Sequence, residues 1–390
     1  MPPAQHQLQA DRGNAKLKFL DRTLGIPLVV TLGGIRQLRG RRAVPDDWHT
    51  IGLMKLAGIG DTVLLSAIVA DIRETRPDAR IVIFVNASNV EFARLLDDVD
   101  AVVELPVRNV PEAIRLVRTQ QCDVVVDFGA WARLETILTV SSGARATVGM
   151  RTRGQHRHGP YDVTVEHGSD HELTNYRALI EAVGVRTGHR PALHLHDDPG
   201  SPLPEPYAVF HLWPGGSNFE ERSWPEAGWE QLARACNERG LAVVLTGGPG
   251  DAAPTERIVD GWCRRGIRAQ SIAGTPPAES LVWLVHATGV VSVNTGVMHV
   301  AAAAGAPTIA LNGPTSGRRW GPVGPHTRCV ASPMVPDGYL DLGFERDDRY
   351  RDCMAAITVD AVLAAWDDLQ AEVAAASDRT GSGGAGHVRR

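Results

Sequence analysis

Short apolar runs alternate with amphipathic segments along most of the chain. The apolar runs have the length and the β-branched content of buried strands, and they lie at 51–56 (IGLMKL), 80–85, 101–105 and 122–129. Segments with helical spacing separate them, at about 61–76, 90–96, 111–119 and 131–142. Strands that alternate with helices form parallel sheets, so we predict one α/β domain over residues 48–186.

A second series of the same kind begins at Tyr207. Its expected strands are at 207–212, 241–248, 290–293 and 308–311, and its expected helices at 226–239, 253–264 and 297–304, with a further unassigned element at 281–287. Residues 187–206 carry five prolines and little periodicity, which is typical of a linker. The pattern therefore predicts a second Rossmann-like domain over 207–358.

Three further segments have distinct patterns. Residues 149–165 are basic and contain histidines, and Ser169-x-x-Glu172 predicts a capping box that opens a helix ending near Ala182. A last helix is expected over 359–375. The tail at 376–390 is rich in Gly, Ser and charged residues, so we expect disorder there.

The N-terminal extension, residues 1–47, differs in charge from the rest of the chain. Residues 1–42 contain eight Lys or Arg and two Asp, around an apolar patch at 24–35. One interpretation is a flexible or helical arm that packs on its own protein. The other is a peripheral contact with an anionic membrane surface, on the inner face of the plasma membrane.

Composition excludes several classes of protein. The chain has 390 residues, 43% hydrophobic and 22% charged, with a net charge of −5 that does not favour nucleic acid. Its five cysteines are scattered without a CxxC pair, which indicates a reducing compartment. No apolar run is long enough to span a membrane, and no signal-peptide cleavage pattern is seen. We therefore expect a cytoplasmic protein.

Residues 290–322 contain the pattern most informative about function. A buried strand, the turn Asn294-Thr295-Gly296, an alanine-rich helix and a second strand follow one another closely. Ligands of parallel sheets bind beyond the carboxyl ends of strands, where helix N-termini offer unpaired N–H groups. Thr295 and Gly296 are therefore predicted to face an anion. His299, one turn along this helix, is either a further anion contact or a structural histidine.

The first strand of the chain leads into the turn Gly58-Ile59-Gly60-Asp61. Two glycines allow a ligand to approach the backbone closely, and Asp61 falls at the start of a helix. Asp61 is either a functional carboxylate that faces the cleft between the domains or only a helix N-cap. The turn is not a dinucleotide fingerprint, because position 63 is Val rather than Gly.

The first loop of the second domain, WPGGSNFEERSWP, contains a further candidate site. Gly215, Gly216 and Ser217 could hold a phosphate, and Arg222 could add charged donors. The alternative is a surface loop with a solvated arginine. Gly248, in the turn after the next strand, would border a nucleotide, although a plain tight turn fits equally well.

We predict no metal site. His167 and His171 have the spacing of helical ligands, but no third ligand is evident. The Asp98-x-Asp100 pair matches a metal-binding pattern of sugar-nucleotide enzymes, but it lies in a connection where a solvated acidic turn is expected.

Taken together, the motifs resemble those of glycosyltransferase family 9, the bacterial ADP-heptose:lipopolysaccharide heptosyltransferases and their relatives. The resemblance covers roughly residues 51–364. Its marks are KLAGIGDTVLLSAIVADIRETRPDARI, DVVVDF, HLWPGGSNFEERSWPEAGWEQLA, VVLTGGPGD and VNTGVMHVAAAAGAPTIALNGPT followed by Trp320-Gly321-Pro322. It implies the GT-B fold, with an N-terminal acceptor domain and a C-terminal nucleotide-sugar domain facing each other across a cleft.

The resemblance also implies residue roles. Asp61 matches the family's general base, Arg222 its donor-phosphate cation, Thr295-Gly296 its diphosphate turn and His299 its histidine. The reaction implied is metal-independent and inverting, with a nucleotide sugar as co-substrate and no cofactor. Two departures affect the donor: Arg222 replaces a common Lys, and Asn294 replaces a common Asp, so the preference for ADP-heptose is less certain than phosphate binding.

The resulting hypothesis is transfer of a sugar, heptose by resemblance, to a glycolipid or cell-envelope saccharide in lipopolysaccharide biosynthesis. Domain closure would exclude water from the donor. Two alternatives remain open from the sequence. One is a sugar-nucleotide epimerase or hydrolase on the same fold, and the other is a non-catalytic scaffold that binds nucleotide sugars.

Overall fold

The computed structural model describes residues 19, 21–216, 219–342, 345 and 347–382. The chain divides into two compact units, residues 1–194 and 195–390. The division falls inside the Pro-rich segment 187–206. We describe each unit by itself.

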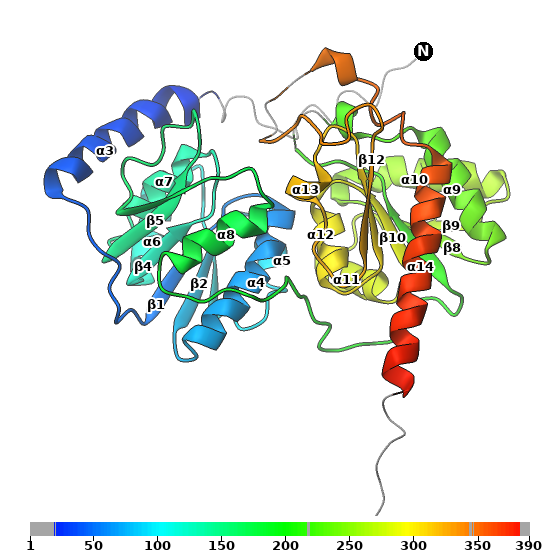
Figure 1. Ribbon diagram of the computed structural model, residues 1–390, viewed down its shortest axis with the longest axis horizontal. Coiled ribbons are helices and arrows are strands. Elements are labelled where there is room, and N and C mark those ends of the chain that lie inside the picture. The colour runs from blue at the N-terminus through cyan, green and yellow to red at the C-terminus, as the bar shows by residue number, and fades with distance from the viewer. Residues whose placement is uncertain (1–18, 20, 217–218, 343–344, 346, 383–390) are drawn as a thin grey trace, which may run out of the picture. The chain divides into compact units, whose positions relative to one another are not determined.

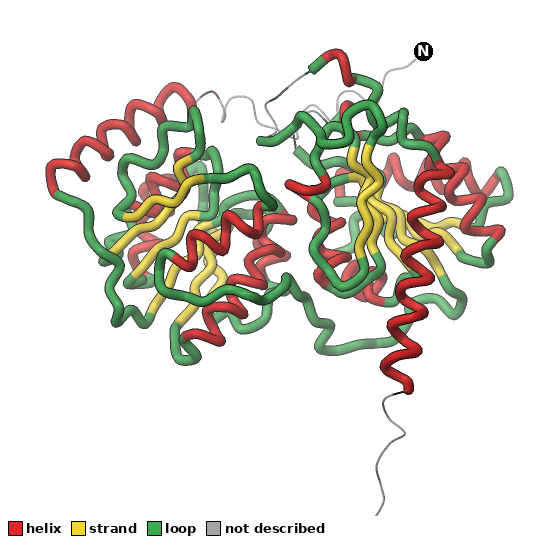
Figure 2. Tube along the Cα trace, viewed as in Figure 1, coloured by secondary structure: helices red, strands yellow, loops and turns green. Residues whose placement is uncertain are grey.

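Unit 1 is built around a six-stranded parallel sheet in the order β3-β2-β1-β4-β5-β6 (Figures 1 and 2). Its strands are β1 (Thr50–Met54), β2 (Arg80–Val85), β3 (Ala101–Glu104), β4 (Val124–Asp127), β5 (Ala146–Arg151) and β6 (Val163–Glu166). Its helices are α3 (Ile26–Arg39), preceded by the π-turn η1 (Asp21–Gly25), α4 (Ile59–Thr75), α5 (Val90–Ala93), α6 (Val110–Thr119), α7 (Arg133–Val140) and α8 (Glu172–Glu181). The apolar run of β1 is central, and it pairs with β2 on one side and β4 on the other.

Unit 2 has a sheet of the same size and topology, in the order β12-β11-β10-β7-β8-β9, with every pair parallel. Its strands are β7 (Tyr207–His211), β8 (Ala242–Thr246), β9 (Ala269–Ser271), β10 (Gly289–Val293), β11 (Thr308–Asn312) and β12 (Thr327–Ala331). Its helices are α9 (Glu226–Glu238), α10 (Ala252–Arg264), α11 (Pro277–Val285), α12 (Gly296–Ala303), α13 (Gly317–Trp320) and α14 (Val359–Ser382), with 3-10 turns η2 (Glu220–Arg222), η3 (Pro249–Asp251) and η4 (Asp348–Tyr350). Both sheets have the Rossmann strand order, as the sequence predicted.

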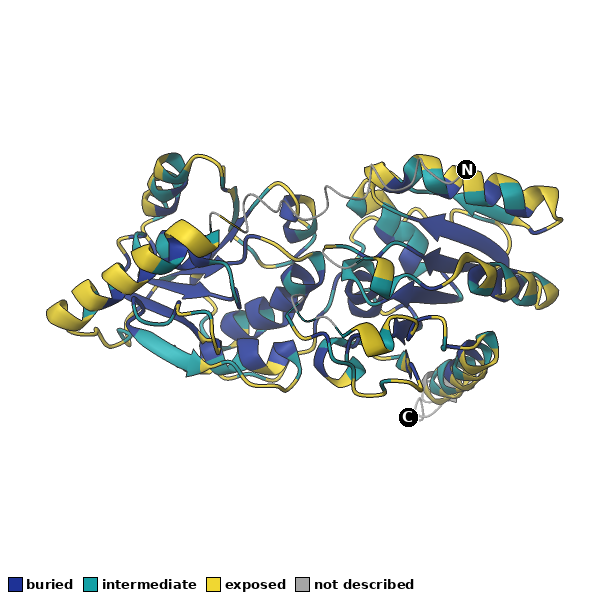
Figure 3. Ribbon diagram, turned by 90° about the horizontal axis from the view of Figure 1, so that it is seen from above, coloured by how far each residue is buried: buried dark blue, intermediate teal, exposed yellow. Residues whose placement is uncertain are grey.

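The inner strands of both sheets are buried and appear dark blue in Figure 3, whereas the edge strands β3, β6, β9 and β12 are mostly half-buried. In unit 2, three tryptophans, Trp224, Trp229 and Trp262, belong to one apolar core with side chains from β7, β8, β10 and β11. None of the helices in the described ranges has the length and apolar character needed to cross a membrane.

The sequence analysis missed four strands, β5 and β6 of unit 1 and β9 and β12 of unit 2. Most residues of β5 and β6 fell in the basic, histidine-bearing segment 149–165, where Arg151, Arg153 and Arg157 mask the neighbouring apolar residues. Gly149 in β5 leaves room for the side chain of Tyr161. A Cβ at this position would overlap the ring of Tyr161, which lies against the strand.

Two predicted boundaries were wrong. Helix α8 begins at Glu172, and its N-cap is His171, whose Nδ1 accepts a hydrogen bond from the Leu173 amide, so Ser169 does not open the helix. Helix α14 continues through residues 376–382, where disorder was expected, and the Ser377 hydroxyl donates to the Val373 carbonyl one turn earlier. Residues 383–390 lie outside the described part of the chain.

Candidate functional site

The turn after β1 has a backbone conformation that requires glycine. Gly58 has a φ of +94°, and a Cβ there would overlap the carboxylate of Asp61. The Gly58 carbonyl accepts from both the amide and the hydroxyl of Thr62, each at 2.9 Å. Gly60 is buried in the first turn of α4. The two glycines thus place Asp61 at the carboxyl end of the central strand.

Asp61 is paired with Lys55, the residue that follows β1. The distance from Lys55 Nζ to Asp61 Oδ2 is 2.9 Å, and the two side chains are 8% and 25% exposed. Burial by itself lowers the pKa of Lys55, but the charges of Asp61 and Glu135 outweigh it, so the pKa is raised. Lys55 is therefore a fixed cation beside a carboxylate that remains partly accessible.

The surroundings of Lys55 hold it in place. Lys55 Nζ also lies 3.4 Å from the Phe128 carbonyl, just after β4, and its own carbonyl accepts from Asn89 at 2.9 Å. Glu135 accepts from the Leu56 amide at 2.9 Å. Burial and the charge of Asp127 raise the pKa of Glu135 to about 7, although Lys55 and Arg157 oppose this shift.

Sequence reasoning assigned no role to Lys55. The available signal was a lysine at the end of an otherwise apolar strand, since a buried ammonium group needs a charged partner. Tyr176 adds a second neighbour, because Lys55 Nζ lies 5.9 Å from its ring centroid. Burial, followed by the charges of Asp61, Glu172 and Glu135, raises the pKa of Tyr176 well above its usual value. The hydroxyl of Tyr176 is therefore protonated at neutral pH.

A fully buried ion pair lies behind this turn, at the end of β4. Arg157 and Asp127 are both 0% exposed, with 2.5 Å between Nη2 and Oδ2. Tyr161 donates to the same carboxylate oxygen, and the Gly129 amide donates to the other. Burial lowers the pKa of Arg157, but the charges of Asp127, Tyr161 and Glu135 raise it more. The basic segment at 149–165 therefore supplies a structural cation to the sheet.

In unit 2, the predicted phosphate loop and the turn after β10 lie side by side. They follow β7 and β10, which are neighbours at the point where the strand order reverses. A Cβ on Gly215 would lie 3.7 Å from Thr295 Oγ1. Gly216 has a φ of +77°, and a Cβ there would lie 3.5 Å from Arg222 Nη2. Ser217 falls outside the described residues. Gly215, Gly216, Arg222 and Thr295 are thus brought together.

Arg222 lies in η2 and is partly buried. Its Nη2 donates to the Gly215 carbonyl, which joins the guanidinium to the loop. Burial lowers the pKa of Arg222 to about 10, so the side chain stays charged at neutral pH. A desolvated guanidinium beside glycine-rich backbone suits an anionic ligand.

Helix α12 begins at Gly296, with Thr295 as an extended N-cap residue whose side chain makes no capping hydrogen bond. The first N–H groups of α12 therefore depend on partners from outside the helix. His299 is buried in the second turn of α12. This arrangement fits the anion position predicted from the sequence.

Gly248 and the histidine pair lie in other settings. The Gly248 amide donates to Asp251 Oδ2 at 2.9 Å, so its N–H group is used inside the turn. His167 Nε2 lies 3.0 Å from Glu172, and His171 caps α8. Asp100 pairs with Arg73 and accepts from the Ile81 amide. Within the described ranges, no three His, Cys, Asp or Glu side chains are grouped to hold a metal ion.

Asn294 uses its amide inside the protein. Its Nδ2 donates to the Trp320 carbonyl at 3.0 Å, which ties the turn after β10 to α13. An aspartate cannot donate this bond and would place a carboxylate against a carbonyl oxygen. Asn294 thus ties the turn after β10 to the Trp320-Gly321-Pro322 segment.

We expect Asn294→Asp to lower the free energy of unfolding by about 1 kcal/mol or more and to weaken nucleoside diphosphate binding. Urea denaturation and calorimetric titration with ADP measure the two effects. Asn109→Asp is the matched control, because Asn109 caps α6 by accepting from the Glu112 amide and an aspartate accepts equally well. Equal stability and affinity in the two variants would contradict the role of the Asn294 donor.

Part of the chain matches a known protein family. Residues 170–337, which include the unit 2 cluster, match the family model of glycosyltransferase family 9 (heptosyltransferase). This stretch of the chain is similar to glycosyltransferase family 9. Lipopolysaccharide heptosyltransferase 1 of Salmonella typhimurium is 33% identical over 143 residues, which is 35% of this chain and 41% of the relative. The enzyme of the same name from Pseudomonas aeruginosa is 37% identical over 123 residues, 30% of this chain and 31% of the relative. The chain thus matches less than half the length of these curated relatives.

Solved structures show the fold over a longer stretch. E. coli ADP-heptose lipopolysaccharide heptosyltransferase II superposes with a TM-score of 0.67 at 18% identity, over 83% of this chain and 99% of that one. E. coli heptosyltransferase WaaC with ADP gives 0.65 at 18% identity, over 82% and 99%. The two Rossmann-like units therefore have the GT-B architecture that the sequence predicted.

Proposed function

We propose that this protein is an inverting, metal-independent glycosyltransferase of lipopolysaccharide biosynthesis, which moves heptose from ADP-heptose to a glycolipid or saccharide acceptor. One observation carries the proposal. The stretch that matches the heptosyltransferase family contains Gly215, Arg222 and Thr295 grouped at the strand-order reversal of unit 2. Open α/β sheets bind their ligands at such a reversal.

The donor diphosphate would bind at this cluster. Arg222 supplies two or more N–H donors and a positive charge, and the start of α12 supplies backbone N–H groups. These groups would stabilise the charge that grows on the diphosphate as it leaves, the role that a metal ion has in other transferases. The choice of ADP as the nucleotide is supported by E. coli heptosyltransferase WaaC, which was solved with ADP.

The acceptor would be activated in unit 1. Asp61 would take the proton from the acceptor hydroxyl as that oxygen attacks the anomeric carbon from the face opposite the diphosphate. The oxygen–carbon bond forms while the bond to the diphosphate breaks, which inverts the configuration. Lys55 fixes the position of the Asp61 carboxylate through their 2.9 Å ion pair.

Replacing Arg222 with Gln is expected to weaken ADP binding about tenfold or more, because a hydrogen bond to a charged group contributes about 1.5–3 kcal/mol. Arg222→Lys should recover part of the affinity, since it restores the charge but not the planar donor geometry. Calorimetric titration with ADP measures both. Arg234→Gln is the control, since this exposed arginine of α9 pairs with Glu230. Unchanged affinity in Arg222→Gln would remove Arg222 from the donor site.

The reaction is tested by two measurements on the purified full chain. A thermal-shift panel of ADP-, GDP- and UDP-sugars identifies the donor, because a ligand at 100 times its dissociation constant stabilises a protein by about 2.7 kcal/mol. Release of nucleoside diphosphate is then followed with and without a glycolipid acceptor. Acceptor-dependent release supports transfer. Release without an acceptor indicates a hydrolase, a changed sugar without release an epimerase, and binding without either a scaffold.

A further inference from the structure

Helix α3 and the turn before it expose an unusual amount of apolar surface. Among the described residues, seven large apolar side chains are exposed, and all but Met334 lie between positions 19 and 38. These six are Phe19, Leu24, Leu28, Val30, Ile35 and Leu38, and Leu38 is 91% exposed. Exposed apolar residues scattered singly need no explanation, but such a concentration on one element indicates a binding surface.

The opposite side of α3 already packs on unit 1. Gly25, Val29 and Gly33 are buried, and they recur every four residues along one side of the helix. At Gly33 the helix backbone approaches Gly159 so closely that a Cβ would lie 3.2 Å from it. Leu24, Leu28, Ile35 and Leu38 fall on the other side by helical spacing. Helix α3 is therefore apolar on two sides, and only one of them is covered.

Ion pairs hold this orientation. Arg36 lies 3.2 Å from Asp162, and Arg42 lies 2.7 Å from the other oxygen of the same carboxylate, which is 0% exposed. Before the helix, Asp21 pairs with Arg133 of α7 at 3.0 Å. The inner side is thus anchored through polar contacts at both ends, which leaves the outer apolar side facing away from the sheet (Figures 1 and 3).

The charge around this apolar side has one sign. Between Asp21 and Asp46 the chain contains five arginines and no acidic residue, although the whole chain has a net charge of −5. Arg39 and Arg41 are exposed and make no ion pair with any described residue. An apolar surface bordered by arginines is complementary to a layer of apolar chains with anionic headgroups.

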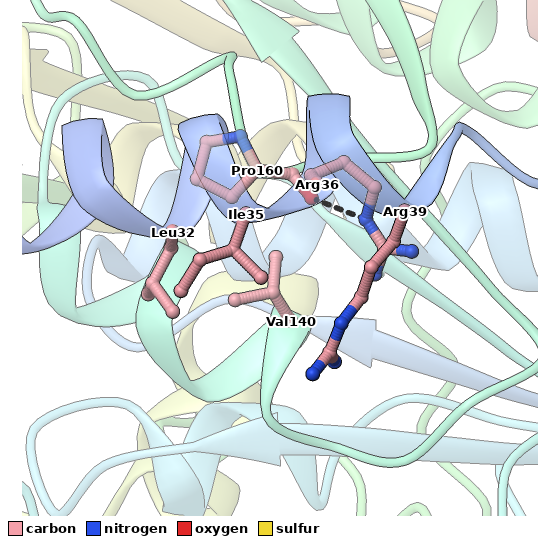
Figure 4. A pocket seen from close by; sticks show the side chains of 6 residues that line it. All are labelled: Leu32, Ile35, Arg36, Arg39, Val140 and Pro160. Carbon is pink, nitrogen blue, oxygen red and sulfur yellow. Dashed lines mark hydrogen bonds between the residues drawn. The ribbon is translucent and has the colours of Figure 1, made fainter.

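A small pocket lies where α3 meets α7 (Figure 4). Its volume is about 100 Å³, and it is lined by Leu32, Ile35, Arg36, Arg39, Val140 and Pro160. Apolar side chains form one part of the lining, and the two arginine side chains extend along the other (Figure 4). The pocket therefore lies at the border between the packed side of α3, which carries Arg36, and the outer side, which carries Ile35.

We propose that α3 is an interfacial helix that docks unit 1 on the surface of an anionic lipid bilayer. Leu24, Leu28 and Leu38 would enter the boundary between headgroups and acyl chains, while Arg39 and Arg41 contact headgroup phosphates. With 14 residues, α3 lies on the membrane and does not cross it, since a spanning helix needs about 20. This inference does not depend on the proposed transfer reaction.

Vesicle flotation of the full chain tests the proposal. We expect binding to vesicles of phosphatidylcholine with about one third phosphatidylglycerol, weaker binding at high salt, and little binding to phosphatidylcholine alone. Leu24→Gln with Leu38→Gln should reduce the partition coefficient about tenfold or more, because both side chains are exposed and would enter the lipid. Arg39→Gln with Arg41→Gln should reduce binding to anionic vesicles and flatten its salt dependence.

Met334→Gln removes an exposed apolar side chain in unit 2 and serves as the matched control, with wild-type binding expected. The melting temperature and ADP affinity of each variant separate loss of docking from loss of the fold or of the donor site. Wild-type partitioning in the two leucine variants would overturn the proposal. So would a chain that ignores vesicles and instead forms a dimer that the leucine substitutions dissociate, because the outer side of α3 would then bind a second copy.

Discussion

Replacing Asp61 with Asn is expected to slow sugar transfer about 100-fold or more, because the amide cannot take the proton of the acceptor hydroxyl. The substitution keeps the shape of the side chain, and an amide oxygen can still accept from Lys55 Nζ, so the turn after β1 should keep its structure. Donor binding should be nearly unchanged, since the diphosphate cluster belongs to unit 2. Initial rates of nucleoside diphosphate release and calorimetric titration with ADP measure the two quantities.

Glu74→Gln is the matched control for Asp61→Asn. It removes one negative charge from the same helix, α4, at a side chain that is 67% exposed. We expect wild-type turnover for this variant. Near-wild-type turnover in Asp61→Asn would eliminate Asp61 as the general base and leave its contact with Lys55 as a structural one.

The contact between Asp61 and Lys55 argues against a simple capping role for Asp61. An N-cap aspartate acts through the backbone amides of its own helix, but no such side-chain cap is formed at the start of α4. Asp61 instead contacts Lys55, which is held by Asn89 and by the Phe128 carbonyl. The carboxylate is therefore positioned by a buried cation from the central strand and not by the helix end that follows it.

The parts of the fold that the sequence predicted depend on local patterns. Strand β2 was predicted over 80–85, where the structure has it, because its apolar run is bounded by polar residues on both sides. The turns at Gly58 and Thr295 were found because a glycine-bearing break between a buried strand and a helix is visible in the sequence alone. In unit 2, the strand order then places two such loops together.

The parts that were missed depend on contacts between distant residues. Arg157 lies in the connection between β5 and β6, and it reaches Asp127 at the end of β4, the strand beside β5. A basic segment gives no sign of which acid it will reach. The cap of α8 was misplaced for a related reason. A Ser-x-x-Glu pattern competes with His171, and the Glu172 carboxylate is used by His167 and Asn175.

Arg157→Met is expected to lower the free energy of unfolding by about 3–5 kcal/mol, because it leaves the Asp127 carboxylate buried without its counter-charge. This is a large fraction of the 5–15 kcal/mol that is typical of a domain. Tyr161 and the Gly129 amide still donate to the carboxylate, but neither carries a charge. Urea denaturation of the purified chain measures the change.

Two variants decide whether the unpaired charge causes this loss. Arg151→Met removes an arginine from the same segment, but its pair with Glu166 is exposed at both ends, so a change of about 0–1 kcal/mol is expected. Asp127→Asn combined with Arg157→Met removes both charges and should recover most of the stability, because an amide costs less to bury than an isolated carboxylate. If Arg157→Met alone does not fold, the double variant still separates the cases. A double variant as unstable as the single one would mean that Arg157 acts through its packing, and the ion pair would then contribute little to holding the β5–β6 connection against the end of β4.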